Sequence, residues 1–447
     1  MNKLEEHPTV KKIREKQIQL KPFGSQQMLD ADWLKKLCLG FGADDVGFVE
    51  VERPEIDVDR DSIEQYAPWT KTLVAFVCRM NKEPVRTTAR SVANLEFHHA
   101  GDQVNEVAKK IVTALEEKNI RAINPSMGFP MEMDQFPGKI WVISHKLVAV
   151  AAGLGQIGIH RNVIHPRFGN FILLGTVLME ASLAKQSQPI DYNPCVSCKL
   201  CVAACPVGAI GSDGDFNFSS CYTHNYKEFM GGFTNWVETI ADSKDGKDYR
   251  NKVNDAESAS VWQSLSYGAN YKAAYCMAVC PAGEDVMSPF LANRPEFVKE
   301  IVKPLQQKKE SIYVVKGSDA EEHVLKRFQH KTIRHINNGL RPTTIENFLT
   351  GLKLTFQRNQ SKGLNATYHF VLEGVEQQQA TITIKNKQLT IVEGLVGQAS
   401  IKITADSQVW VKFIRKEASL PWALIRRKIR IKGNPKLLIK FGKCFLA

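Results

Sequence analysis

The chain has 447 residues, 43% of them hydrophobic, and a formal net charge of +12. This length exceeds one small ferredoxin module and predicts two or three domains. No run of eighteen apolar residues occurs and the first nineteen residues are polar and charged, so we expect neither a membrane span nor a secretory signal. Because the ten cysteines indicate no disulfide framework, we expect a reducing, cytoplasmic setting.

The first half of the chain predicts an α/β domain behind a short arm. Residues 1–29 are predicted to form a flexible basic arm. In the domain expected over residues 30–192, apolar spacing predicts helices over 30–40 and 101–118 and strands over 46–51 and 72–77. Alternation of this kind favours helices layered on a sheet.

A glycine-rich elbow follows, in which Gly153, Gly155 and Gly158 form G-x-G-x-x-G. The acidic residue that a nicotinamide-binding fingerprint carries about twenty positions later is absent, which disfavours a Rossmann site. Three close glycines still allow the backbone to approach a bulky ligand or another helix. Asn162 adds a polar rim to this elbow.

The most specific pattern is a bacterial ferredoxin run, C-x2-C-x2-C-x3-C-P. A later Cys-x3-Cys-Pro repeats its ending. Each run can therefore supply one cysteine to the cluster that the other run mainly holds, which gives two [4Fe–4S] clusters. Zinc or disulfides are disfavoured, because zinc ribbons show two separate CxxC pairs. One cluster is assigned Cys195, Cys198, Cys201 and Cys280, and the other Cys205, Cys221 and Cys276.

The second cluster has only three evident thiolates, because Ala273 stands three residues before Cys276. Three outcomes are open: a non-cysteine ligand, a [3Fe–4S] cluster, or a cubane with one open iron. His224 is a candidate imidazole ligand, and the alternative is a hydrogen-bonding histidine. We assign this two-cluster module to residues 193–305, with residues 229–260 as an inserted excursion.

The C-terminal part, residues 321–447, predicts an α+β unit. Its expected elements are helices over 321–337, 344–356 and 407–415, strands over 366–373, 380–385, 388–392 and 400–405, and closing segments over 423–432 and 435–445. Eleven Lys or Arg and one acid lie between Lys412 and Lys443. Such a stretch can face anionic lipid or nucleic acid, or form a solvated rim.

The order of these motifs, from Ala151–Gly158 through Asn162, Gly169 and Leu173-Leu174-Gly175 to the cysteine runs, resembles epoxyqueuosine reductases and reductive dehalogenases. The resemblance covers about residues 30–289. It implies a corrinoid (cobalamin) in the α/β part, with the glycine elbow and Asn162 near it. It also implies clusters that feed electrons to a reductive step, and an electron donor such as ferredoxin or flavodoxin.

Two departures from that family affect the substrate. His145 stands eight positions before Gly153, where epoxyqueuosine reductases carry an acidic residue. A histidine can donate a proton near neutral pH, so His145 is the candidate catalytic acid, with a structural histidine as the alternative. Ala273 is the second departure. Together they leave the retention of the corrinoid open and argue against a tRNA epoxide as substrate.

The C-terminal part resembles the sterol-carrier-protein type of lipid-binding domain, through its element order and the ending Arg430–Leu437. That fold implies an apolar tunnel, and hence a small or apolar substrate or a docking surface. We therefore expect an iron–sulfur oxidoreductase. The alternatives are a non-catalytic electron carrier or redox sensor docking at a partner or membrane surface, and a tRNA-modifying reductase.

Overall fold

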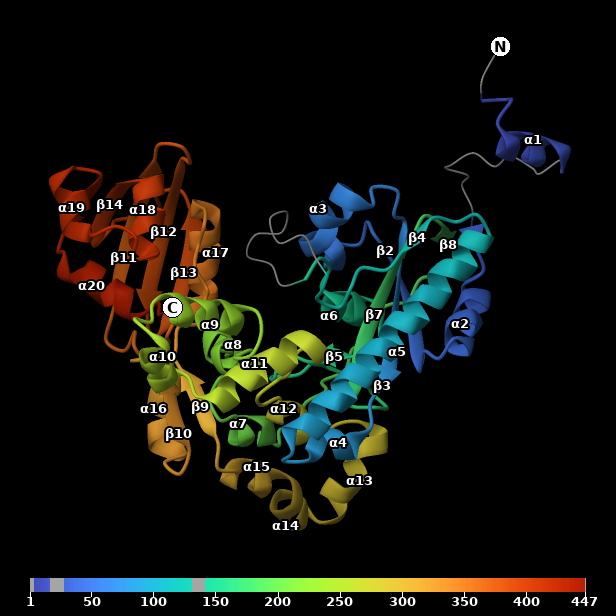
Figure 1. Cartoon of the computed structure of the whole chain (residues 1–447), viewed down its shortest axis with the longest axis horizontal. Helices are drawn as coiled ribbons and strands as arrows, with labels where there is room; N and C mark the ends of the chain where they lie inside the picture. Colours follow the sequence, from blue (N-terminus) through green and yellow to red (C-terminus); the bar gives the residue numbers. More distant parts are fainter. Residues whose placement is uncertain (1–3, 17–27, 131–140, 447) are drawn as a thin grey trace.

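The computed structural model describes residues 4–16, 28–130 and 141–446 (Figure 1). Within the arm predicted to be flexible, it contains helix α1 (Pro8–Glu15), which buries no residue and stands apart from the other elements in Figure 1. Strand β1 (Met28–Leu29) pairs in parallel with β8 (Ser182–Leu183). Residues 1–3 and 17–27 of the arm lie outside the described residues.

A four-stranded sheet in the order β2-β3-β7-β4 forms the centre of the N-terminal domain. Its strands are β2 (Asp45–Glu50), β3 (Thr72–Arg79), β7 (Ile172–Met179) and β4 (Ala122–Ile123), and all their pairings are antiparallel. The sheet confirms the predicted mixture of helices and strands.

Helices cover both faces of this sheet, which is why β3 is buried at every residue except Arg79. On one face, α2 (Ala31–Gly40) and α5 (Arg90–Glu117) pack against alternate strand residues such as Val74 and Phe76. On the other face, α3 (Asp57–Tyr66) and α6 (His145–Ala151) pack against Leu73 and Ala75. The prediction that the long helix begins at residue 101 is wrong, because residues 90–100 continue α5 and bury Ala93 and Phe97.

The cysteine module is a set of short helices. They are α7 (Leu200–Ala204), α8 (Phe218–Asn225), α9 (Gly231–Ala241), α10 (Gly246–Lys252), α11 (Asp255–Tyr267), α12 (Tyr275–Ala278), α13 (Glu284–Ala292), α14 (Arg294–Phe297), a π-helical turn (Val298–Val302) and α15 (Lys303–Gln307). The predicted excursion over 229–260 is helical, and a capping box between Asn254 and Glu257 starts α11.

The core of this module extends past residue 305. It includes residues of β9 (Ser311–Val314) and α16 (Asp319–Arg327) together with Cys201 and Cys205. The predicted helix over 321–337 is wrong beyond Arg327, because β10 (Thr332–His335) pairs in parallel with β9. Residues assigned to the last domain from sequence therefore share the core of the cysteine module.

The C-terminal domain is a five-stranded sheet in the order β13-β12-β11-β14-β15. Its strands are β11 (Ala366–Glu373), β12 (Gln378–Lys385), β13 (Gln388–Glu393), β14 (Ile401–Asp406) and β15 (Ile429–Gly433), and its helices are α17 (Ile345–Thr355), α18 (Ser407–Ile414), α19 (Leu420–Ile425) and α20 (Lys436–Lys443). The predicted order of elements is confirmed. Aromatic rings fill much of its core, including Phe348, Phe370, Trp410 and Phe441.

This domain packs on the helix that carries Cys221, and Figure 1 shows α17 beside α8. The Gln357 side-chain amide donates to the Ser219 hydroxyl at 2.9 Å, in a buried contact. Arg358 pairs with Asp213 at 2.6 Å nearby. No helix in the described ranges is both long and apolar enough to span a bilayer.

Candidate iron–sulfur site

The first cysteine run forms a tight loop that leads into α7. Ser197 and Lys199 adopt left-handed conformations, with φ of 55° and 52°. Backbone amides point at sulfur atoms on both sides of the loop: Ile159 N–H donates to Cys195 Sγ at 3.4 Å, and Ala209 N–H donates to Cys205 Sγ at 3.3 Å. Such N–H groups stabilise a thiolate and tune any cluster that it holds.

The seven predicted ligands lie in two groups. Electrostatic contacts join Cys280 to Cys195 and Cys198, and Cys201 to Cys198 and Cys280. A second set of contacts joins Cys221 to both Cys205 and Cys276. Cys201 also interacts with Cys276, so the two groups are neighbours. The fold thus gathers all seven predicted cysteines into one neighbourhood, in which Cys276 also interacts with Cys280, and their division into two sets stays a prediction from the sequence.

Burial shapes the chemistry of these thiols. It raises the pKa of Cys276 to about 12 and that of Cys280 to about 11. A buried thiol of this kind loses its proton when a metal binds. In the described part of the chain, no three His, Cys, Asp or Glu side chains converge on one point as ligands of a single metal ion. A [4Fe–4S] cubane has a different requirement, since each thiolate binds a separate iron atom.

Two buried guanidinium groups lie beside the cysteines. Arg86, at the end of α4 (Lys82–Arg86), interacts with Cys280, and Arg90, at the start of α5, interacts with Cys276. Desolvation lowers the pKa of both arginines. In each, Nε and Nη2 are buried and find no hydrogen-bond partner among the described residues. Nη1 of Arg86 pairs with Glu83 at 3.3 Å, and Nη1 of Arg90 donates to the Thr87 carbonyl at 3.0 Å. The N–H groups left without partners suit a buried anionic group, which is what a cubane with its thiolates would provide.

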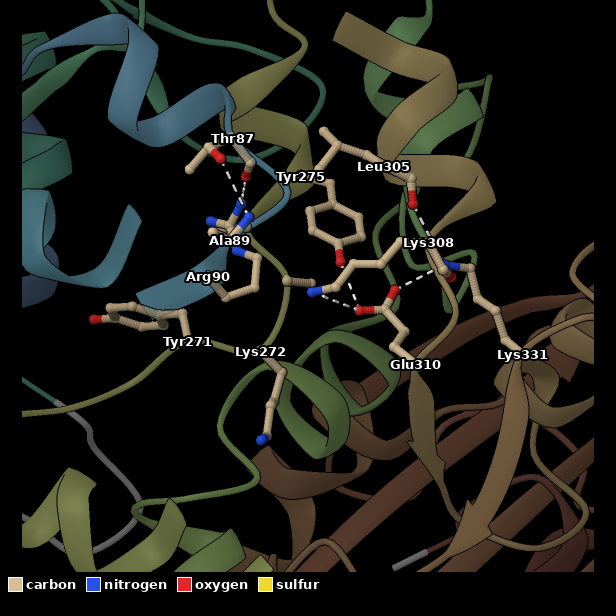
Figure 2. Close-up of polar contacts among 12 residues, drawn as sticks. Thr87, Ala89, Arg90, Tyr271, Lys272, Tyr275, Leu305, Lys308, Glu310 and Lys331 are labelled. Atoms are coloured by element: carbon tan, nitrogen blue, oxygen red, sulfur yellow. Dashed lines mark hydrogen bonds and ion pairs between the residues drawn. The ribbon is translucent and has the colours of Figure 1, made fainter. Parts of the chain in front are cut away.

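A polar network fixes α12, which carries Cys276, against the start of β9 (Figure 2). The Tyr275 hydroxyl donates to Glu310 Oε2 at 2.7 Å, and Lys331 Nζ donates to Glu310 Oε1 at 2.7 Å. The Arg90 guanidinium lies 5.3 Å from the centre of the Tyr275 ring. Because Tyr275 precedes Cys276, these contacts also position a predicted ligand.

The glycine elbow lies between α6 and the hairpin of β5 (Gln156–Ile157) and β6 (Val163–Ile164). A Cβ at Gly153 would lie 2.3 Å from the carbonyl oxygen of Gln188, and one at Gly155 would lie 2.4 Å from that of Ile164. A Cβ at Gly158 would meet the Ile164 side chain at 2.7 Å. The close approaches that require glycine are therefore made to the chain's own residues, so these glycines are explained without a bound ligand.

His145, the predicted catalytic acid, is buried at the start of α6. Its Nδ1 lies 2.8 Å from the Thr176 hydroxyl and its Nε2 lies 3.1 Å from the carbonyl oxygen of Ser126. Because a carbonyl only accepts, Nε2 carries the proton. Burial lowers the pKa of His145, so the ring is neutral at pH 7 and its one N–H is used within the protein.

The next residue, Lys146, is one that sequence reasoning missed. Its Nζ donates to the Arg161 carbonyl at 2.8 Å and to Asn162 Oδ1 at 3.0 Å, and it interacts with Cys221 and Cys276. Surrounding protein lowers its pKa, although the side chain keeps access to solvent. Only the folded chain shows that this ammonium lies beside the second group of cysteines, because some 75 to 130 residues separate them in sequence.

His224 packs against Tyr313 of β9. Its Nδ1 accepts a hydrogen bond from the Tyr313 amide at 3.3 Å, and its ring stacks on Tyr313. Its charged neighbours are Glu310 and three lysines, and burial lowers its pKa to about 4. Nδ1 is thus used within the protein, whereas the buried Nε2 has no partner among the described residues, and His224 stays a candidate ligand.

Comparisons with known proteins agree with these two parts of the chain. A model of the 4Fe-4S binding domain matches residues 189–211, and a model of the SCP-2 sterol transfer family matches residues 350–445. An epoxyqueuosine reductase from Lactococcus garvieae is 27% identical over 143 residues, which are 32% of this chain and 33% of that protein. The chain combines a segment similar to epoxyqueuosine reductases with an SCP-2 domain. It spans about a third of the length of the curated relatives that it matches.

Two solved structures also align with this chain. One is a reductive dehalogenase whose description refers to B12-dependent dehalogenation; it has 16% identity, covers 69% of this chain and 39% of its own, and gives a TM-score of 0.39. The other is an epoxyqueuosine reductase with a modified tRNA stem loop; it has 17% identity, covers 67% of this chain and 82% of its own, and gives a TM-score of 0.34.

Proposed function

We propose that this protein is an iron–sulfur oxidoreductase that reduces a bound substrate with electrons passed through two clusters. The observation that carries the proposal is the pair of cysteine groups, each beside a buried guanidinium whose Nε and Nη2 have no hydrogen-bond partner among the described residues. When bound, the clusters supply single-electron transfer. The likeness to epoxyqueuosine reductases supports a reductive direction.

We place the electron donor and the substrate at different cysteine groups. Cys195 and Cys198 are half-buried, and Val196 between them is 41% exposed, so we place the electron donor, a ferredoxin or flavodoxin, at this loop. The second group lies beside Lys146, where we place the substrate. Arg90 lies beside Cys276 and stabilises negative charge that arrives there.

A two-electron reduction also consumes two protons, and the chain must deliver them. Lys146 is the better placed donor, since its ammonium is solvent-accessible and lies beside Cys221 and Cys276. Its lowered pKa brings proton release closer to neutral pH. The role of His145 as the catalytic acid stays a prediction. Its hydrogen bonds with Thr176 and Ser126 also suit His145 to hold α6 in place. We assign no step to a corrinoid.

The proposal is tested first by the metal content of anaerobically purified full-length protein. We expect about eight irons and eight sulfides per chain, because each of two clusters holds about four. Cobalt is measured after incubation with cobalamin and desalting. About one cobalt per chain would restore the corrinoid to the mechanism, and absence of iron and sulfide would refute the proposal.

The second test is turnover. Oxidation of reduced methyl viologen is followed on addition of an aryl halide or of an epoxyqueuosine-bearing tRNA stem loop. Lys146→Met is expected to lower the rate at least tenfold with unchanged iron content, whereas Lys146→Arg retains part of the activity. Cluster reduction without turnover on any probe would favour the electron carrier.

A further inference from the structure

The second cluster is one thiolate short, and the fold shows where that thiolate is missing. We infer that Cys205, Cys221 and Cys276 hold a cubane whose fourth iron faces Ala273 and binds a small exogenous anion instead of a side chain. This inference rests on the proposed function and specifies the cluster at which its substrate is reduced.

The two cysteine runs have the same local backbone. Lys199, after Cys198, has φ 52° and ψ 22° and starts α7, whose second residue is Cys201. Ala274, after Ala273, has φ 54° and ψ 25° and starts α12, whose second residue is Cys276. Since left-handed non-glycine residues are uncommon, this repetition marks one structural motif used twice. Ala273 therefore occupies, in the second run, the position that Cys198 occupies in the first.

Two neighbouring polar side chains, Asn225 and His224, are candidates for a substitute ligand. The amides of Ala273 and Ala274 donate to Asn225 Oδ1 at 3.0 and 3.1 Å, which uses that oxygen. His224 Nδ1 accepts from the Tyr313 amide, whereas its buried Nε2 has no partner among the described residues. Ala273 itself is buried and provides no donor atom. Among these residues His224 Nε2 is therefore the one donor that competes with an exogenous ligand, and His224→Gln, which removes it, is expected to leave the response to ferricyanide unchanged.

The surroundings select an anion and let it enter. Arg90, whose Nε and Nη2 are buried without partners, lies beside Cys276, and the Lys146 ammonium lies beside Cys221 and Cys276. Cys221 and Cys276 are half-buried, whereas Cys205 is buried. Two cations at a partly accessible group of thiolates favour a small anionic ligand over a neutral one.

An iron without a thiolate is also the one lost on oxidation. Ferricyanide would take one electron from a [4Fe–4S]²⁺ cluster, which releases Fe²⁺ and leaves [3Fe–4S]⁺. Fe²⁺ and a reductant such as dithionite would reverse the step. The experiment treats full-length protein with ferricyanide and counts [3Fe–4S]⁺ spins by electron paramagnetic resonance. We expect about one spin per chain.

Ala273→Cys restores the fourth thiolate and is expected to lower the spin count at least tenfold, whereas Ala273→Val, which adds bulk without a ligand, keeps it. Cyanide, as the anionic probe, is expected to change the reduced spectrum of the unmodified protein but not that of Ala273→Cys. Intact clusters in the unmodified protein that neither lose iron nor respond to cyanide would overturn the inference and leave the proposed function standing. A protein without iron and sulfide would refute both.

Discussion

The contact between Lys331 and Glu310 offers a prediction whose size follows from the structure. The Lys331 side chain is 0% exposed, and its ammonium donates to Glu310 at 2.7 Å and to the carbonyls of Lys308 and Leu305 at 2.8 and 3.3 Å. Lys331→Met removes the charge and keeps most of the volume. Removing one partner of a buried ion pair costs about 3–5 kcal/mol, because the other charge stays buried.

Glu310 keeps two partners in that variant, the Tyr275 hydroxyl at 2.7 Å and Lys308 at 3.3 Å. We therefore expect the lower end of the range, about 3 kcal/mol. With a denaturant slope of about 3 kcal/mol/M, the urea midpoint falls by about 1 M. The midpoint is read from loss of the visible absorbance of the clusters in anaerobic protein. Since Tyr275 precedes Cys276, the second cluster is lost first.

Lys308→Met is the matched control, because that side chain is 26% exposed and its ion pair is expected to contribute less than about 1 kcal/mol. Adding Glu310→Gln to Lys331→Met removes both charges, and the double variant is expected to lose less than the sum of the single variants by about 2 kcal/mol. Equal midpoints for Lys331→Met and Lys308→Met, or strictly additive losses, would refute the reasoning.

Two further predictions concern charge. Arg90→Gln removes a cation beside Cys276 and is expected to lower the reduction potential of the second cluster. An interaction of roughly 2 kcal/mol, at about 8 Å and an effective dielectric constant near 20, corresponds to a shift of about 90 mV for a one-electron couple in a redox titration. An unchanged potential would contradict the assignment. Burial lowers the pKa of His160 and of His224 to about 4, so the unfolded chain takes up their protons first and stability is lost as pH falls from about 6.5 toward 4. His224→Gln should remove about half of that acid sensitivity in unfolding measured across this range, and an unaltered pH profile would show that His224 is charged in the folded state.

Local spacing was sufficient for much of this protein. The cysteine spacing divided seven residues into two predicted groups, because the two Cys-x3-Cys-Pro endings repeat one local pattern. The alternating patterns of the C-terminal domain predicted its first four strands to within two residues, since each buries one face against the same core. The absent cysteine at Ala273 was equally visible, because it is a gap in a repeated spacing.

What the sequence could not determine depends on pairings between distant segments. Thr332–His335 forms a strand because it pairs with β9. Its own residue pattern does not indicate this pairing, so the prediction extended the preceding helix through these residues. The glycine elbow approaches Gln188 and Ile164, which no spacing within the elbow reveals. Arg90 and Lys146 lie far from Cys276 in sequence and next to it in the fold. Spacing along one segment therefore singled out the thiols predicted to bind metal, whereas tertiary packing placed the cations around them, because electrostatic neighbours are set by distance in space.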